Sequence, residues 1–169
     1  AVAGQFFMTQ RILSIPLTFV GRAFGQVFYQ KSNENINDGI SVRPLVLKTS
    51  LTLFAIICIP MTMLFFFGEP IFELVLGEKF KEAGSIASMF SVFYLFRFVF
   101  SAQSTLLTTK RKLTTEIIFN SIFLISQVGA VIYGHVMHDY YLAFQLMAVS
   151  GAVLFLILGI LIFKYAGEK

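Results

Sequence analysis

The chain has 169 residues, of which 57% are hydrophobic and 13% are charged, and its mean hydropathy is +0.80. These values lie outside the range of ordinary soluble proteins and predict an all-α integral membrane protein. The net charge of +4 does not indicate nucleic-acid binding, because the charges lie mostly between apolar runs, as orientation signals do. A single cysteine, Cys58, excludes a disulfide framework and a thiol metal site. His135 and His138 have no acidic or cysteine array around them, so we expect neither a metal nor a cofactor.

Five apolar runs are long enough to cross a bilayer, since one crossing needs about 20 residues. Their approximate ranges are 5–30, 45–67, 84–107, 113–134 and 140–164. We therefore treat residues 1–169 as a single membrane region with five transmembrane helices. The sequence begins at Ala1, without an initiator methionine and a few residues before the first run, which suggests a piece of a longer protein.

The first run carries two arginines, Arg11 and Arg22, on either side of Pro16. At about 100° per residue, both arginines fall on one third of the helix circumference. That face consists of Arg11, Ser14, Thr18, Arg22, Gly25 and Tyr29. Because a charge in hydrocarbon is expensive, this face predicts a wet cavity or a polar ligand, with a kink at Pro16. The alternative is that the two arginines reach the two membrane interfaces with their long side chains.

Prolines and small residues predict how the remaining apolar runs end and pack. The polar stretch 31–44 has the composition of a loop, and Pro60 predicts a kink in the second helix. Between Pro70 and Gly77 lies an apolar turn, residues 71–76, which is too short to span and is expected to lie in the membrane interface. In the fifth run, the small residues Ala148, Gly151 and Ala152 predict close helix packing.

Lysines and arginines are distributed unequally between the two sides of the predicted membrane region. Eight lie on the side reached after the first, third and fifth helices, against two, Lys79 and Lys81, on the other. This bias places the C-terminus in the cytoplasm and Ala1 outside. The eight are Lys31, Arg43, Lys48, Lys110, Arg111, Lys112, Lys164 and Lys169.

Polar residues also line one face of the third and fourth runs. Arg97 shares a face with Ser101, Ser104 and Thr108, and the fourth run aligns Glu116, Asn120, Phe123, Gln127 and Gly134. The short basic loop between these runs predicts antiparallel neighbours. Arg97 lies about 16 Å before the loop, Asn120 about 12 Å after it and Glu116 about 6 Å after it, so Arg97 should reach Asn120 more easily than Glu116. For Arg97 we favour a ligand or cavity role. For Asn120 and Gln127 we favour hydrogen bonds between helices.

Two segments carry a resemblance to a known family. They are QRILSIPLTFVGRAFGQVFYQKSNE at residues 10–34 and FGEPIFELVLGEKFKEAGSIASMF at residues 67–90. With them the chain resembles the polysaccharide biosynthesis branch of the multidrug/oligosaccharidyl-lipid/polysaccharide exporter superfamily, which includes O-antigen flippases. The first segment is similar to the eighth helix of that family and the second to its outer loop, although Phe80 stands where a tryptophan is expected.

The resemblance implies that the chain forms helices eight to twelve of a transporter with two six-helix lobes around a cationic cavity. Such a protein is not an enzyme. It moves an undecaprenyl-pyrophosphate-linked oligosaccharide outward across the bacterial inner membrane by alternating access, and its N-terminal lobe is the missing partner. Arginine suits this substrate because its planar charged fork matches phosphate oxygens. The resemblance implies Arg11 first, with Arg22 and Arg97 behind it, as substrate-binding residues, and the polar helix faces add Thr18, Asn120 and Gln127 as cavity candidates.

Three other functions remain open at this point. A cation-coupled multidrug exporter of the same superfamily would favour acidic cavity residues, and Glu116 is the residue placed to couple transport to an ion. A membrane enzyme of envelope synthesis would need converging carboxylates or a histidine, whereas His135, His138 and Asp139 lack a nucleophile. A scaffold protein would not need three arginines in membrane helices.

Overall fold

The computed structural model describes residues 2–168, with side-chain surroundings from Gly4 onward, so that Ala1 and Lys169 lie outside the described residues. All the regular elements of this part of the chain are helical. Five stretches are long and apolar enough to cross a membrane, which confirms the all-helical prediction and suggests a multi-pass membrane protein. The elements are α1 (Val2–Asn37), α2 (Arg43–Leu76), the 3-10 turn η1 (Glu78–Phe80), α3 (Lys81–Ser101), α4 (Thr105–Thr109), α5 (Leu113–Val136) and α6 (Tyr140–Ala166).

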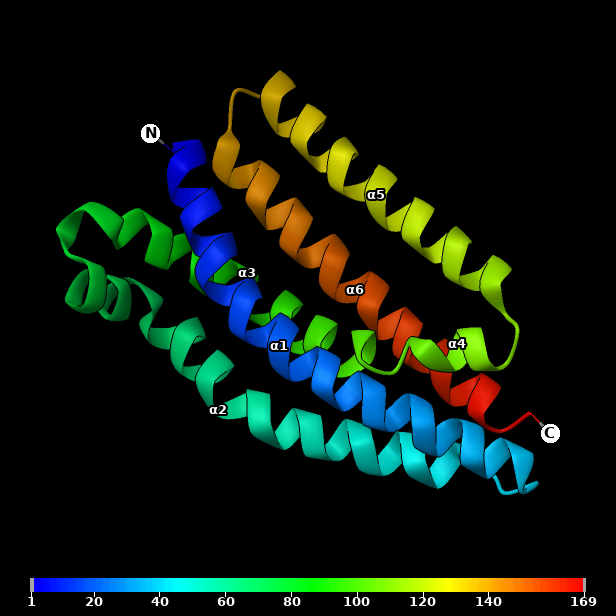
Figure 1. The fold of residues 1–169 in the computed structure, drawn as a ribbon. Helices are drawn as coiled ribbons and strands as arrows, with labels where there is room; N and C mark the ends of the chain where they lie inside the picture. The colour runs from blue at the N-terminus through cyan, green and yellow to red at the C-terminus, as the bar shows by residue number, and fades with distance from the viewer. Residues whose placement is uncertain (1, 169) are drawn as a thin grey trace.

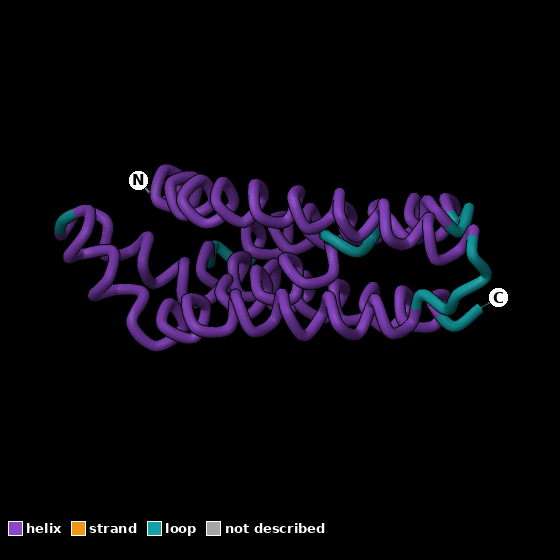
Figure 2. Tube along the Cα trace, turned by 60° about the horizontal axis from the view of Figure 1, so that its bottom comes forward, coloured by secondary structure: helices purple, strands orange, loops and turns teal. Residues whose placement is uncertain are grey.

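Helix α3 lies at the centre of the bundle. It packs against α2, α6 and α1, and the long helices run along one common direction (Figures 1 and 2). Its aromatic residues Phe90, Phe93, Tyr94 and Phe98 are all buried. The core of the molecule therefore forms around α3, whereas α1 and α5 keep large apolar side chains exposed, as lipid-facing helices do.

Helix α6, and not α5, packs along α3, so the predicted pairing of the third and fourth runs is wrong. Helix α5 packs on the far side of α6. The reason is the small-residue face of α6: a Cβ atom on Gly151 would lie 2.5 Å from the ring of Phe93, and one on Gly159 would lie 2.5 Å from the ring of Phe100. The predicted close packing through Ala148, Gly151 and Ala152 is confirmed, because all three are buried.

Helix α1 is longer than predicted, because residues 31–37 continue it instead of forming a loop. Ser32 is fully buried and donates a hydrogen bond to the carbonyl oxygen of Phe28 at 2.7 Å, and Ile36 packs against the core. Burial of one face thus extends the helix through a polar sequence. The helix ends where Gly39 takes a φ of +71°, a conformation that favours glycine.

The main irregularity of α2 lies at Phe67, not at Pro60 as predicted. Phe67 has φ −126° and ψ 22°, and the chain bends there before continuing as helix to Leu76. Pro70 explains the position, since a proline removes the hydrogen bond to the carbonyl four residues earlier and clashes with it. Helices α1 and α2 continue through Pro16 and Pro60. The apolar turn 71–76 is the last part of α2, with Leu74 88% exposed.

The connections between helices gather at the two ends of the bundle. The α1–α2 connection, the α4–α5 connection and the end of α6 lie at one end, and the α2–α3 and α5–α6 connections lie at the other (Figure 1). The basic segments 43–48 and 110–112 and Lys164 therefore share one end, as the charge count predicted. Arg43 stacks on the Phe163 ring of α6 at 4.6 Å, and Lys110 donates a hydrogen bond to the Glu168 carbonyl oxygen at 2.6 Å.

Candidate ligand-binding groove

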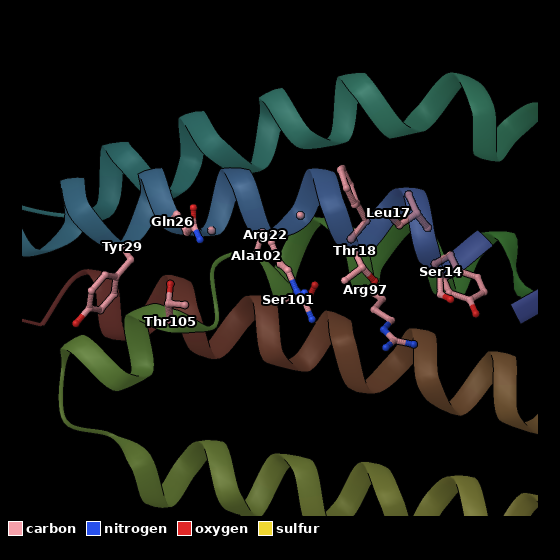
Figure 3. Close-up of a pocket in the computed structure, with 14 residues that line it drawn as sticks. Ser14, Leu17, Thr18, Arg22, Gln26, Tyr29, Arg97, Ser101, Ala102 and Thr105 are labelled. Carbon is pink, nitrogen blue, oxygen red and sulfur yellow. The ribbon is translucent and has the colours of Figure 1, made fainter. Parts of the chain in front are cut away.

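A groove of about 580 Å³ lies between α1 on one side and α3 and α4 on the other (Figure 3). Its volume is typical of a small-molecule site. It is lined by Ser14, Leu17, Thr18, Gly21, Arg22, Gly25, Gln26, Tyr29, Tyr94, Arg97, Phe98, Ser101, Ala102 and Thr105.

The α1 wall of the groove is the polar face that helical spacing predicted, from Ser14 to Tyr29. Two glycines on this face bring α1 close to α3 without filling the groove. A Cβ atom on Gly25 would lie 3.2 Å from the carbonyl oxygen of Ala102, and one on Gly21 would lie 4.0 Å from the ring of Phe98. The predicted face of α1 therefore borders a groove from Ser14 onward, and its role in binding a polar ligand stays a prediction.

Two arginines from different helices enter the groove. Arg22 comes from α1 and is exposed, and Arg97 comes from α3 and is half-buried. Both side chains extend into the space between α1 and α6 in the view of Figure 3. The guanidinium carbon of Arg97 lies 5.7 Å from the ring centre of Phe93 and 5.9 Å from that of Tyr94, within the range of a cation–π contact. The residues that line the groove include these two arginines and no carboxylate, so its charged groups are all cationic.

Neutral hydrogen-bonding groups surround the two arginines. Hydroxyl groups come from Ser14, Thr18 and Tyr29 on α1 and from Ser101 and Thr105 on the opposite wall. The Thr105 hydroxyl oxygen is buried and has no hydrogen-bond partner within residues 2–168. An unpaired buried hydroxyl at a cavity wall is available to a ligand or to water. The sequence pattern missed Thr105 and Tyr94, because the first follows the break after α3 and the second reads as a core aromatic.

Three of the predicted substrate residues, Arg11, Asn120 and Gln127, are not among the residues that line the groove. Arg11 is exposed on α1. Gln127 of α5 donates a hydrogen bond to the Met147 carbonyl oxygen of α6 at 3.3 Å, which is the helix-to-helix role that we favoured for it. Thr18, Arg22 and Arg97 are the predicted residues that the fold brings together.

A second cavity, of about 190 Å³, lies on the other side of Arg97, between α3, α5 and α6. Arg97 and Ser101 line both this cavity and the groove. Asn120 and Glu116 of α5 line the second cavity together with Arg97, and the expectation that Arg97 reaches Asn120 more easily than Glu116 stays a prediction. The remaining lining residues are Ser104, Leu107, Phe119, Phe123, Phe155 and Leu158.

Glu116 has one hydrogen bond to a side chain, accepted from the Thr108 hydroxyl at 3.1 Å. Among residues 2–168, no three histidine, cysteine, aspartate or glutamate side chains are grouped as a metal site would require. The charge of the groove therefore comes from its arginines.

Comparisons of the chain with protein-family models, with curated proteins and with solved structures gave no match.

Proposed function

We propose that this chain is the C-terminal part of a flippase that translocates undecaprenyl-pyrophosphate-linked oligosaccharide across the bacterial inner membrane. The observation that carries the proposal is the pair Arg22 and Arg97, which two separate helices bring into one groove without a carboxylate among its lining residues. An uncompensated pair of charges inside a membrane bundle is expensive, so a function that requires an anion is the best reason for it.

The chemistry of the groove matches a pyrophosphate followed by a sugar. Guanidinium groups bind phosphate oxygens through two parallel hydrogen bonds and stay charged at any physiological pH. The hydroxyls of Thr18, Tyr29 and Ser101, with the Gln26 amide, offer the donors and acceptors that sugar hydroxyls need. The apolar surfaces of α1 and α2 would face the bilayer and the undecaprenyl chain.

The groove is open on one side, which fits the proposal that a second lobe completes it. In that arrangement α1, α3 and α4 form one wall of a central cavity, and an N-terminal lobe of six helices forms the other. Alternating access then requires the two lobes to rock about the bound pyrophosphate. The surface polysaccharide of the cell would be built from the oligosaccharides delivered outside.

A cation-coupled multidrug exporter is the second candidate, and Glu116 in the smaller cavity is the observation that favours it. A cationic drug in the groove, however, would meet Arg22 and Arg97 and be repelled by both. The positive charge of the groove therefore supports an anionic substrate in preference to a cationic one.

Arginine substitutions in the complete transporter test this proposal. We expect Arg22→Ala and Arg97→Ala each to reduce surface polysaccharide at least tenfold, with lipid-linked repeat units accumulating on the cytoplasmic side. A hydrogen bond to a charged group contributes about 1.5–3 kcal/mol, and about 1.4 kcal/mol corresponds to a factor of ten.

Arg11→Ala is the matched control, because it removes an exposed arginine from the same helix outside the groove. It should leave polysaccharide production within about twofold of the unmodified protein at equal membrane levels, well below the effect of one lost charged hydrogen bond. Normal polysaccharide in both groove variants would contradict the proposal.

A further inference from the structure

Arg97 borders two cavities of opposite electrostatic character. In the groove the other charged residue of the lining is Arg22, and in the second cavity it is Glu116. The same guanidinium is thus repelled by a neighbour on one side and attracted by a neighbour on the other.

The side chains leave space for Arg97 to move. Arg97 and Glu116 line the same cavity of about 190 Å³, yet the ion pair found among residues 2–168 joins Lys112 and Glu168 instead. Glu116 is held by the Thr108 hydroxyl, and Arg97 stacks near rings of its own helix. A long side chain that is fixed by stacking alone can rotate toward a facing carboxylate.

The surroundings of Glu116 leave Arg97 as the cation that shares its cavity. Helix α6 contributes the apolar residues Phe155 and Leu158, and α4 contributes Leu107 and Thr108. The α4–α5 loop carries Lys110, Arg111 and Lys112, of which Lys112 pairs with Glu168 and Lys110 binds the Glu168 carbonyl oxygen. Arg111 is exposed to solvent.

We propose that Glu116 is a positioning residue that competes with the anion in the groove for Arg97. This inference rests on the proposed function, since it concerns the same anion site. Without an anion, repulsion by Arg22 and attraction by Glu116 draw Arg97 toward the second cavity, so that Arg97 divides its time between the two cavities. When a pyrophosphate enters the groove, Arg97 joins Arg22 on it and leaves Glu116 with its Thr108 hydrogen bond.

This competition lowers the affinity of the groove for an anion, and the size of the effect can be calculated. If Arg97 faces the groove for only a fraction of the time, the apparent Kd equals the intrinsic Kd divided by that fraction. Removing the competing charge raises the fraction and tightens binding. Adding a second carboxylate to the same cavity has the opposite effect, and Asn120 provides the place for it.

Calorimetric titration of the chain in detergent micelles with inorganic pyrophosphate tests the competition. We expect Glu116→Gln to lower the Kd by about threefold to tenfold, because it frees Arg97. Glu116→Asp keeps the charge and should bind within about twofold of the unmodified chain, whereas Asn120→Asp should raise the Kd. In an Arg97→Gln background the gain from Glu116→Gln should disappear. An unchanged or higher Kd in Glu116→Gln would overturn the inference.

A double-mutant cycle without ligand separates this inference from the proposed function. The midpoints of thermal unfolding of Arg97→Gln, Glu116→Gln and the double variant should be non-additive if the two side chains interact. Additive midpoints would overturn the competition whatever the titration shows. If the cycle is non-additive but the unmodified chain and Glu116→Gln both fail to bind pyrophosphate, the pairing stands and the proposed anion site fails.

Discussion

The two sides of α3 are packed in opposite ways. On the side that faces α2, near the start of α3, the backbones of Gly68 and Gly84 lie in close contact, and the Ser88 hydroxyl donates a hydrogen bond to the Leu64 carbonyl oxygen at 2.8 Å. Toward α1, the same helix borders a groove of about 580 Å³. The tight side fixes the backbone of α3 against α2, and Arg97 lines the groove on the open side.

The largest predicted effect comes from breaking the tight side. A Cβ atom on Gly84 would meet the Gly68 carbonyl oxygen and lie 2.7 Å from the Glu69 Cα atom, and these are backbone atoms that cannot rotate away. We expect Gly84→Ala to destabilise the bundle by about 2–3 kcal/mol, the upper range for overpacking. The measurement is the free energy of unfolding in detergent, followed by far-UV circular dichroism.

Gly129→Ala is the matched control for this substitution. Gly129 is also helical, and nothing lies within 4 Å of a Cβ atom placed on it. Alanine there should be neutral or slightly stabilising through helix propensity. Equal unfolding free energies for the two variants would show that the contact between α2 and α3 is looser than its geometry indicates.

A smaller effect is expected at the break between α3 and α4. Gln103 is fully buried, and its amide donates to the Ser50 hydroxyl at 2.9 Å and to the Val99 carbonyl oxygen at 3.0 Å. Gln103→Leu should cost about 1–3 kcal/mol, because it leaves the half-buried Ser50 hydroxyl without its partner. Adding Ser50→Ala should recover part of the loss in the same unfolding measurement. If the double variant were no more stable than Gln103→Leu, the hydrogen bond would not be the source of the loss.

Much of the fold follows from local sequence, and the deviations have tertiary causes. The five spans and the two ends of the bundle follow from apolar length and from the placement of lysine and arginine. The extension of α1 to Asn37 did not follow, because burial of Ser32 outweighed its polar composition. Local sequence also did not predict that α6 lies between α3 and α5. The short α4–α5 loop limits only how far apart the ends of these helices can lie, whereas the glycines of α6 decide which helix packs along α3.

The candidate site was predictable where one helix supplies it and not where several helices meet. Helical spacing placed Thr18 and Arg22 on the polar face of α1, and both line the groove. The same spacing placed Arg11 on this face, but Arg11 does not line the groove. Periodicity shows which face of a helix is polar and not where along its length the helix meets a neighbour. Thr105 could not be found in this way, since its position depends on the turn that follows Ser101.

A substitution on the open side sharpens the contrast with Gly84. A Cβ atom on Gly21 would lie 4.0 Å from the Phe98 ring, an ordinary contact. We therefore expect Gly21→Ala to stabilise the bundle by up to about 1 kcal/mol through helix propensity. A loss of stability at Gly21 in the same unfolding measurement would mean that the groove narrows in solution.

The smallest effect is expected at the end of the bundle, where the one ion pair among residues 2–168 is exposed to water. Lys112 Nζ lies 3.4 Å from Glu168 Oε2, and the two side chains are 42% and 43% exposed. Lys112→Gln should change the unfolding free energy by less than about 0.5 kcal/mol, because solvent and salt screen exposed pairs. The residual effect should vanish in high salt, because dissolved ions screen the pair. The Lys110 bond to the Glu168 carbonyl oxygen is present with or without Lys112. A loss comparable to that of Gly84→Ala would mean that this end, and not the glycine contact between α2 and α3, holds the bundle together.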